Sequence, residues 1–182
     1  MTNIKIDQSV LTKEECFSLL NTAKQSEELL RMGYVLCLTM LTTGMRNSEI
    51  VQLTYTQIDL EQNIIYLNRG HDTNKEKVRI TNDLVEVLHQ YLNNPIFLDW
   101  ISKGNEQVFF MNGKPFNKVT LNTFIKRLAK EDGIEKIVTA RCLRNAFGYM
   151  LIQSGLSLLI VQKLMRLKTI KSLEGYLQVN NY

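Results

Sequence analysis

The chain has 182 residues, of which 45% are hydrophobic and 22% charged, and its formal net charge is +4. This length and apolar content are typical of one globular domain with its own core, and no apolar run approaches the length that crosses a bilayer. The first ten residues, MTNIKIDQSV, lack the basic and apolar segments of a secretory signal, so we expect a single cytoplasmic domain over residues 1–182.

The cysteines and histidines argue against disulfide bonds and metal binding. Cys16, Cys37 and Cys142 are widely spaced and odd in number, which favours unpaired thiols in a reducing compartment. Neither of the two histidines has a cysteine or histidine at ligand spacing. We therefore expect no metal and no cofactor.

The charge is unevenly distributed along the chain. Residues 1–113 contain 10 lysines and arginines against 14 acidic residues, whereas residues 114–182 contain 12 against 4. A basic half of this kind favours a polyanionic partner such as nucleic acid. A solubilising surface gives the same pattern, so charge alone leaves both interpretations open.

The first part of the chain is predicted to be helical. Thr12 and Glu15 have the spacing of a capping box at the start of a helix over 11–25. Residues 26–44 follow as a second, largely buried helix that Gly44 stops. Residues 47–53 form a short third helix, which Asn47 or Ser48 is able to cap.

A small antiparallel sheet is predicted next, from three short β-branched segments at 56–60, 63–68 and 77–81. Helices return after it. Thr81 caps a helix over 82–92, Pro95 marks its exit, and residues 107–111 read as a brief extended segment.

The last part of the chain is again helical. An amphipathic helix over 118–133 begins after Asn117 and is closed by Gly133, and helical segments follow at 139–155, 157–167 and 170–178. The expected fold class is therefore mainly α with a small antiparallel β-sheet (α+β) in the first half.

Two arginines in the 139–155 helix suggest an anion site. Arg141 and Arg144 are three residues apart, so they are neighbours on a face other than the apolar stripe of Leu143 and Phe147. Like charges at this spacing cost about 0.2–0.5 kcal/mol, and an anion bound between them would remove that cost. Two exposed arginines without a ligand are the alternative.

The segment LTTGMRNSEIVQLTYTQIDL, residues 41–60, places Arg46 directly after a Thr-Gly that ends an apolar helix, with Glu49 three residues later. It resembles the first motif of the tyrosine recombinases, the phage-integrase family. In that family the arginine of this motif contacts the scissile phosphate. The resemblance implies the same role for Arg46, with Glu49, one helical turn on, orienting its guanidinium.

Two later segments complete the resemblance, which extends from Leu11 to Tyr176. TARCLRNAFGYMLIQSG is similar to the second motif, with the second catalytic arginine at the place of Arg144 and a histidine at the place of Arg141. MRLKTIKSLEGYLQV resembles the third motif, which ends on the nucleophilic tyrosine at the place of Tyr176. A phenol has a pKa near ~10, so it attacks poorly until it loses its proton to a neighbour or the field of adjacent cations.

The resemblance implies a catalytic set that holds and cleaves a DNA phosphodiester without a metal. Arg46, Arg144 and Arg141 would hold the phosphate, and Tyr176 would form a 3′-phosphotyrosyl link. The family also uses a hairpin lysine as general acid, for which Lys75 is the candidate. Lysines that would contact nucleic acid are Lys77, Lys168 and Lys171. Of these, Lys77 could also replace Lys75 as the general acid.

The chain departs from the family pattern at several places. Arg141 stands for a histidine and cannot act as a base, and Leu167 stands for a histidine or tryptophan and can only pack. Arg166 occupies the place of a glycine in the third motif. Loss of one donor near a developing charge can cost about 2.7–4 kcal/mol in the transition state.

The function expected from the resemblance is site-specific DNA recombination by a recombinase or integrase, with duplex DNA and further copies of the chain, as a tetramer, as partners. The alternative is a non-catalytic or weakly active DNA-binding relative on the same scaffold, and a type IB topoisomerase-like relaxing activity is a lesser variant. The family's N-terminal core-binding domain is expected to be absent, with residues 1–10 as a short extension. The expected setting is a bacterial, phage or mobile-element host cell.

Overall fold

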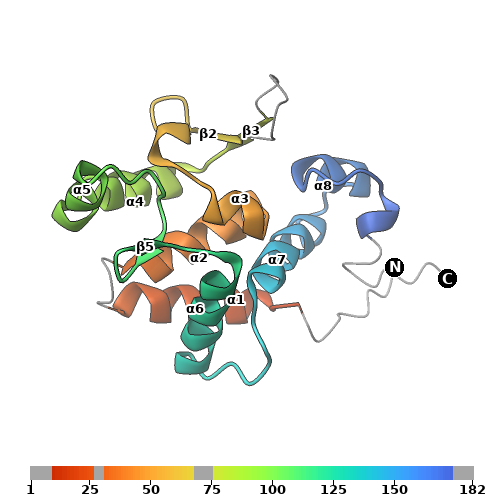
Figure 1. Ribbon diagram of the computed structural model, residues 1–182. Helices are drawn as coiled ribbons and strands as arrows, with labels where there is room; N and C mark the ends of the chain where they lie inside the picture. Colours follow the sequence, from red (N-terminus) through yellow and green to blue (C-terminus); the bar gives the residue numbers. More distant parts are fainter. Residues whose placement is uncertain (1–9, 27–30, 68–75, 174–182) are drawn as a thin grey trace.

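The computed structural model describes residues 10–26, 31–67 and 76–173. Helices dominate these segments (Figure 1), and their bounds are α1 (Lys13–Gln25), α2 (Met32–Thr43), α3 (Asn47–Val51), α4 (Asn82–Leu92), α5 (Pro95–Ser102), α6 (Lys118–Glu131), α7 (Ala140–Gln153) and α8 (Leu158–Leu164). A 3-10 turn, η2, spans Tyr55–Gln57.

The strands form two small antiparallel sheets. The first has the order β1 (Ile58–Asp59), β2 (Ile64–Leu67), β3 (Glu76–Arg79), and the second pairs β4 (Phe110–Met111) with β5 (Lys114–Pro115). In the first sheet Ile65 pairs with Val78, and both are buried. The fold class predicted from the sequence, mainly α with a small antiparallel sheet, is confirmed.

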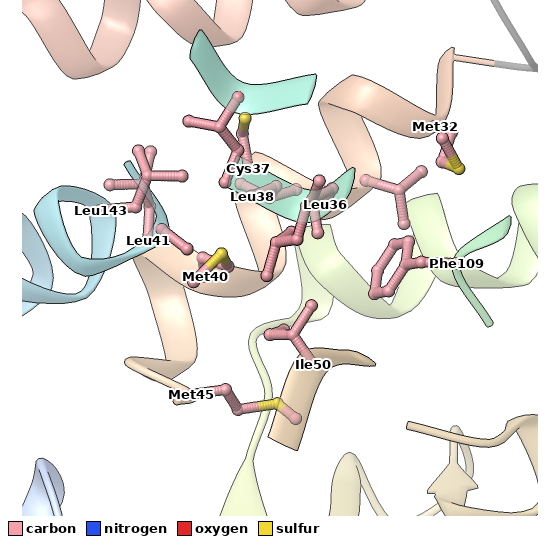
Figure 2. Packing of buried hydrophobic residues seen from close by; sticks show 14 of the residues in the cluster. Met32, Leu36, Cys37, Leu38, Met40, Leu41, Met45, Ile50, Phe109 and Leu143 are labelled. Atoms are coloured by element: carbon pink, nitrogen blue, oxygen red, sulfur yellow. The ribbon is translucent and has the colours of Figure 1, made fainter. Parts of the chain in front are cut away.

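Helix α2 lies at the centre of the molecule. It packs against α1, α4, α6 and α7, and ten of its twelve residues are buried, because it is apolar on all faces. Figure 2 shows Met32, Leu36, Met40 and their α2 neighbours meeting Phe109 and Leu143 from other elements. Packing this dense fixes the position of the turn at which α2 ends.

Several predicted helix boundaries are confirmed. Thr12 and Glu15 form the capping box of α1, Thr81 caps α4, and Asn117 caps α6. The buried second helix also ends at Gly44 as expected, where Gly44 adopts a left-handed conformation with φ of +57°. These ends are set by local hydrogen bonds, which explains why they could be read from the sequence.

Two boundaries were predicted wrongly. The second helix does not run on from 26: Arg31 has a left-handed φ of +61° and α2 begins at Met32. Residue Arg46, rather than Asn47 or Ser48, is the N-cap of α3, because Glu49 bonds back to its main-chain N–H. Helix α4 ends at Leu92, before Pro95, as predicted, and Pro95 begins a further helix, α5, which Asn94 caps.

Helices α7 and α8 carry a second, smaller core. Phe147 on α7 packs with Val161, Met165 and Leu173, and Gly148 allows Met165 of the α8 end to lie directly on α7. This close approach places the turn after α8 beside the end of α2, across from β3 (Figure 1).

Among the described helices, none combines the length and apolarity that crossing a bilayer requires. The three cysteines are all buried and unpaired, as predicted.

Candidate active site

The turn between α2 and α3 is the first component of the site. Gly44 N–H donates to the Met40 carbonyl at 3.0 Å, and a side chain at Gly44 would collide with the ring of Phe147. Glycine is therefore required here both by its left-handed backbone and by the close approach of α7. Arg46 follows two residues later, at a position fixed by the buried helix before it.

Glu49 holds Arg46 by two hydrogen bonds. Its Oε2 accepts from the main-chain N–H of Arg46 at 2.6 Å, and its Oε1 accepts from Arg46 Nη1 at 2.7 Å. The Glu49 side chain is only 10% exposed, whereas that of Arg46 is 33% exposed. The carboxylate thus fixes a guanidinium that still reaches the surface.

Arg144, on α7, is buried beside the same turn. It is 4% exposed, its Nη1 donates to the carbonyl of Gly44, and its Nη2 donates to the carbonyl of Met165 at 2.5 Å. The sequence interpretation placed Arg144 on a polar face with Arg141. That was wrong for Arg144, because tertiary contacts from α2 and α8 cover it, while Arg141 in the first turn of α7 is exposed.

The turn after α8 serves both arginines. Met165 supplies the carbonyl that accepts from Arg144, and the carbonyl of the next residue, Arg166, accepts from Arg46 Nη2. Two guanidiniums from residues 98 positions apart in the sequence are therefore held by adjacent carbonyls of one turn.

Arg166 adds a third guanidinium. Its side chain is 6% exposed, and its Nη2 donates to Glu49 Oε2 at 2.8 Å and to the Gly44 carbonyl at 3.2 Å. Its Nε lies 3.9 Å from Oε2 of Glu76 on β3. Sequence reasoning assigned Arg166 no role; the only signal was an arginine at the place where the resembled motif has glycine.

The charges of this cluster interact strongly. Burial favours the neutral form of Glu49, but the charge of Arg166 and the hydrogen bonds and charge of Arg46 outweigh it and lower the pKa of that carboxyl. Burial lowers the pKa of the Arg166 guanidinium, and Glu49 partly opposes this, but an arginine stays protonated at any physiological pH. The carboxylate of Glu49 is thus paired with both Arg46 and Arg166.

Comparison with known proteins assigns the family. The sequence model described as the Phage integrase family matches residues 9–182. The chain belongs to this family. Its sequence is 28% identical over 172 residues to the tyrosine recombinase XerD of Halalkalibacterium halodurans, a match that covers 93% of this chain and 56% of the relative.

A second relative, the tyrosine recombinase XerA of Saccharolobus solfataricus, is 25% identical over 87% of this chain and 48% of its own length. The chain thus spans about half the length of these curated relatives. Among solved structures, a XerA recombinase superimposes with a TM-score of 0.80 at 24% identity, covering 94% of this chain and 61% of that one. A XerH recombinase bound to its difH substrate superimposes with a TM-score of 0.78 at 22% identity, covering 98% and 52%. At these identities the superpositions show the shared fold.

The remaining candidates of the phage-integrase motifs lie in different places. Tyr176 and Lys75 fall outside the described residues. Leu167 packs into the small core of α7 and α8. Lys168 and Lys171, just after the α8 turn, are exposed.

Lys77 lies on β3, is exposed, and has its Nζ 5.4 Å from the ring centre of its cross-strand partner Tyr66. It also lines a groove of about 400 Å³ between β3, α7 and α8, together with Arg79, Lys163 and Arg166. The groove has an apolar wall that includes Phe147. This mixture of cations over an apolar wall suits an anionic partner of some size.

Proposed function

We propose that this domain breaks and rejoins DNA through a covalent 3′-phosphotyrosyl intermediate, as a site-specific recombinase or integrase. The observation that carries the proposal is the convergence of Arg46 and Arg144 on the turn after α8. Arg46 donates to the Arg166 carbonyl, and Arg144 donates to the adjacent Met165 carbonyl and to the Gly44 carbonyl. Repelling cations are brought together in a protein most readily where an anion is to be bound.

In the proposed reaction the arginines hold the two non-bridging oxygens of one phosphodiester. The Oη of Tyr176 loses its proton and forms a bond to phosphorus, and the bond from phosphorus to the 5′ oxygen breaks. The leaving 5′ oxygen takes a proton, for which Lys75 is the proposed donor and Lys77 the substitute. Attack by a 5′ hydroxyl on the phosphotyrosine reverses each step and rejoins the strand.

Arg141 is proposed to assist at the rim of the site. It lies in the first turn of α7, three residues before the buried Arg144, and is exposed. From there it can meet a phosphate that approaches from solvent, whereas it cannot serve as a base. Lys168 and Lys171, exposed beyond the α8 turn, are proposed to contact the DNA backbone.

The partners follow from the same proposal. Duplex DNA is the substrate, and recombination between two sites would require self-association on DNA, as a tetramer, within the cytoplasm of the host cell. The solved XerH structure is described as bound to its difH substrate, and a lambda integrase structure as a dimer bound to a core site. Because this chain spans about half of its curated relatives, these partners stay proposals for it.

The second candidate function is DNA binding with little or no cleavage. It is favoured by Arg141 and Leu167, which replace a histidine and a histidine or tryptophan of the resembled motifs. A missing donor near a developing charge lowers a cleavage rate by about 10²–10³-fold, and the cluster of arginines would still bind phosphate.

A covalent trap distinguishes the two functions. The chain is incubated with a library of nicked duplexes whose sequence around the nick is randomised, so that cleavage releases a short fragment and prevents rejoining. Covalent adducts are recovered under denaturing conditions and sequenced. An adduct that is lost in Tyr176→Phe and retained in Tyr182→Phe supports the recombinase. Salt-dependent binding without any adduct supports the second function.

A further inference from the structure

Arg166 occupies a backbone position that normally takes glycine. Helices α6, α7 and α8 all end in the same turn, in which the residue after the C-cap is left-handed and its N–H and the next N–H bond back to the helix. The left-handed residue is Gly133 after α6 and Gly155 after α7, but Arg166, with φ of +55°, after α8. A side chain in this conformation costs about 1–2 kcal/mol.

The side chain of Arg166 connects four segments that meet at the site. Besides Glu49 and the Gly44 carbonyl, its Nη1 donates to the Thr43 carbonyl at 3.3 Å, and its Nε faces Glu76. The end of α8 is thereby joined to the end of α2, to α3 and to β3. Glu49 Oε2 accepts from both Arg166 and the N–H of Arg46, so Arg166 helps to fix the carboxylate that orients Arg46.

The charge of Arg166 also changes the balance of the cluster. Its guanidinium places a positive charge beside the carboxylates of Glu49 and Glu76. Such a charge acts more strongly in a buried site than in water, because little solvent screens it.

We propose that Arg166 is a positioning residue of the phosphate site, which fixes Glu49 and Arg46 and adds a positive charge beside them. With its side chain 6% exposed, it acts through these neighbours rather than by touching DNA. The proposal rests on the proposed DNA-cleaving function. It predicts that the glycine of the resembled motif cannot replace Arg166 without loss, although glycine suits the backbone better.

The chain offers a matched control. Arg31 is also an arginine with a left-handed backbone, at φ of +61°, but it is exposed at the start of α2. The twelve residues of α2 separate it from the cluster by about 18 Å along the helix axis. Arg31→Gly and Arg166→Gly therefore remove the same charge and relieve the same backbone strain, at different places.

The experiment compares wild type, Arg31→Gly, Arg166→Gly and Arg166→Lys in three measurements. These are urea unfolding, binding to a fluorescent duplex as a function of salt, and the single-turnover rate of adduct formation on the trapped duplex. All are made well below the unfolding temperature, so that a loss of stability alone does not change the rate.

We expect Arg166→Gly to form the adduct about 10–100-fold more slowly than Arg31→Gly, because Glu49, which orients Arg46, loses its bond to the Arg166 side chain. A misplaced Arg46 should also lose its phosphate, so the slope of log affinity against log salt should become shallower by about one phosphate contact in Arg166→Gly and stay unchanged in Arg31→Gly. Arg166→Lys should keep the slope and recover only part of the rate, because lysine supplies the charge but not the planar fork.

Equal rates and slopes for Arg166→Gly and Arg31→Gly would overturn the proposal. A higher rate of adduct formation in Arg166→Gly would also overturn it, because Arg166 would then compete with Arg46 for Glu49. If Arg166→Gly does not fold, Arg166→Lys with a wild-type rate overturns the positioning role. If the wild type binds DNA but forms no adduct, the proposed DNA-cleaving function is wrong. The difference in salt slope between Arg166→Gly and Arg31→Gly then decides whether Arg166 supports phosphate binding.

Discussion

The ends of α7 and α8 have the same hydrogen-bonded geometry but serve different purposes. After α7, Gly155 is exposed and a Cβ atom there would meet nothing within 4 Å. After α8, Arg166 adopts the same left-handed conformation with its side chain buried among acceptors from α2 and α3. At the end of α7 the left-handed position is taken by glycine, which adopts it at the lowest conformational cost. At α8 the tertiary contacts of one side chain outweigh a local cost.

This difference distinguishes a turn that only ends a helix from a turn that also forms part of the proposed phosphate site. Gly155 only ends a helix, whereas the carbonyls of Met165 and Arg166 accept hydrogen bonds from Arg144 and Arg46, and the Arg166 guanidinium bonds to Glu49. Backbone strain that persists at one site and is avoided at an equivalent one points to a function of the strained residue. Four experiments test how far this contrast holds.

The largest effect is expected from Arg144→Lys, which alters the side chain that the α8 turn holds. Lysine cannot donate to the Gly44 and Met165 carbonyls and to a phosphate with a planar fork, so we expect the adduct rate to fall at least about 100-fold. The single-turnover trapping assay measures this. Exposed Lys126→Ala on α6 is the control and should change the rate little; a rate for Arg144→Lys within threefold of wild type would contradict the assignment.

The second test compares two glycines with the same left-handed backbone. Gly44→Ala would strain the backbone and push a methyl group into Phe147, and we expect it to lower the free energy of unfolding by about 2–4 kcal/mol. Gly155→Ala introduces the backbone strain alone and should lower the free energy of unfolding by about 1 kcal/mol. Urea unfolding measures both; equal losses would show that the contact between α7 and the Gly44 turn is not stabilising.

The third test concerns the carboxylate between the arginines. The pKa of Glu49 is lowered in the folded protein, so its ionisation stabilises the fold above the unfolded pKa of about 4.3, and this is lost as pH falls through the lower folded value. Glu49→Gln should therefore be less stable than wild type by about 1.5–3 kcal/mol at pH 7 and approach it in acid.

Unfolding by urea at pH 7 and near pH 3 makes this comparison, with Glu61→Gln as the control that removes an exposed carboxylate from the loop before β2. A difference between Glu49→Gln and wild type that stays constant across this range would mean that the ionisation of Glu49 does not stabilise the cluster.

The smallest effect is expected from Gly155→Arg, which reproduces at the end of α7 the residue found at the end of α8. A Cβ atom at this position has no neighbour within 4 Å, so we expect the left-handed strain of about 1–2 kcal/mol to be the main effect. The urea unfolding of this variant measures directly the strain that Arg166 overcomes. A stability equal to wild type would mean that arginine is tolerated here without tertiary contacts. The left-handed backbone of Arg166 would then carry no cost for its contacts to offset.

The sequence determined the parts of this protein that depend on neighbours along the chain. The capping box of Thr12 and Glu15, the caps at Thr81 and Asn117 and the helix end at Gly44 were predictable, because each is set by hydrogen bonds within a few residues. The contact of Arg46 with Glu49 belongs to the same class, since a spacing of three residues at a helix start places them together.

Only the tertiary structure decided which arginines are buried. Arg141 and Arg144 look alike in the sequence, yet α2 and the α8 turn cover Arg144 and leave Arg141 exposed. Arg166 could be seen only as an arginine at the place of a glycine, because its partners, Gly44 and Glu49, lie more than a hundred residues away. Burial and charge pairing between distant segments depend on how helices pack, which no local pattern records.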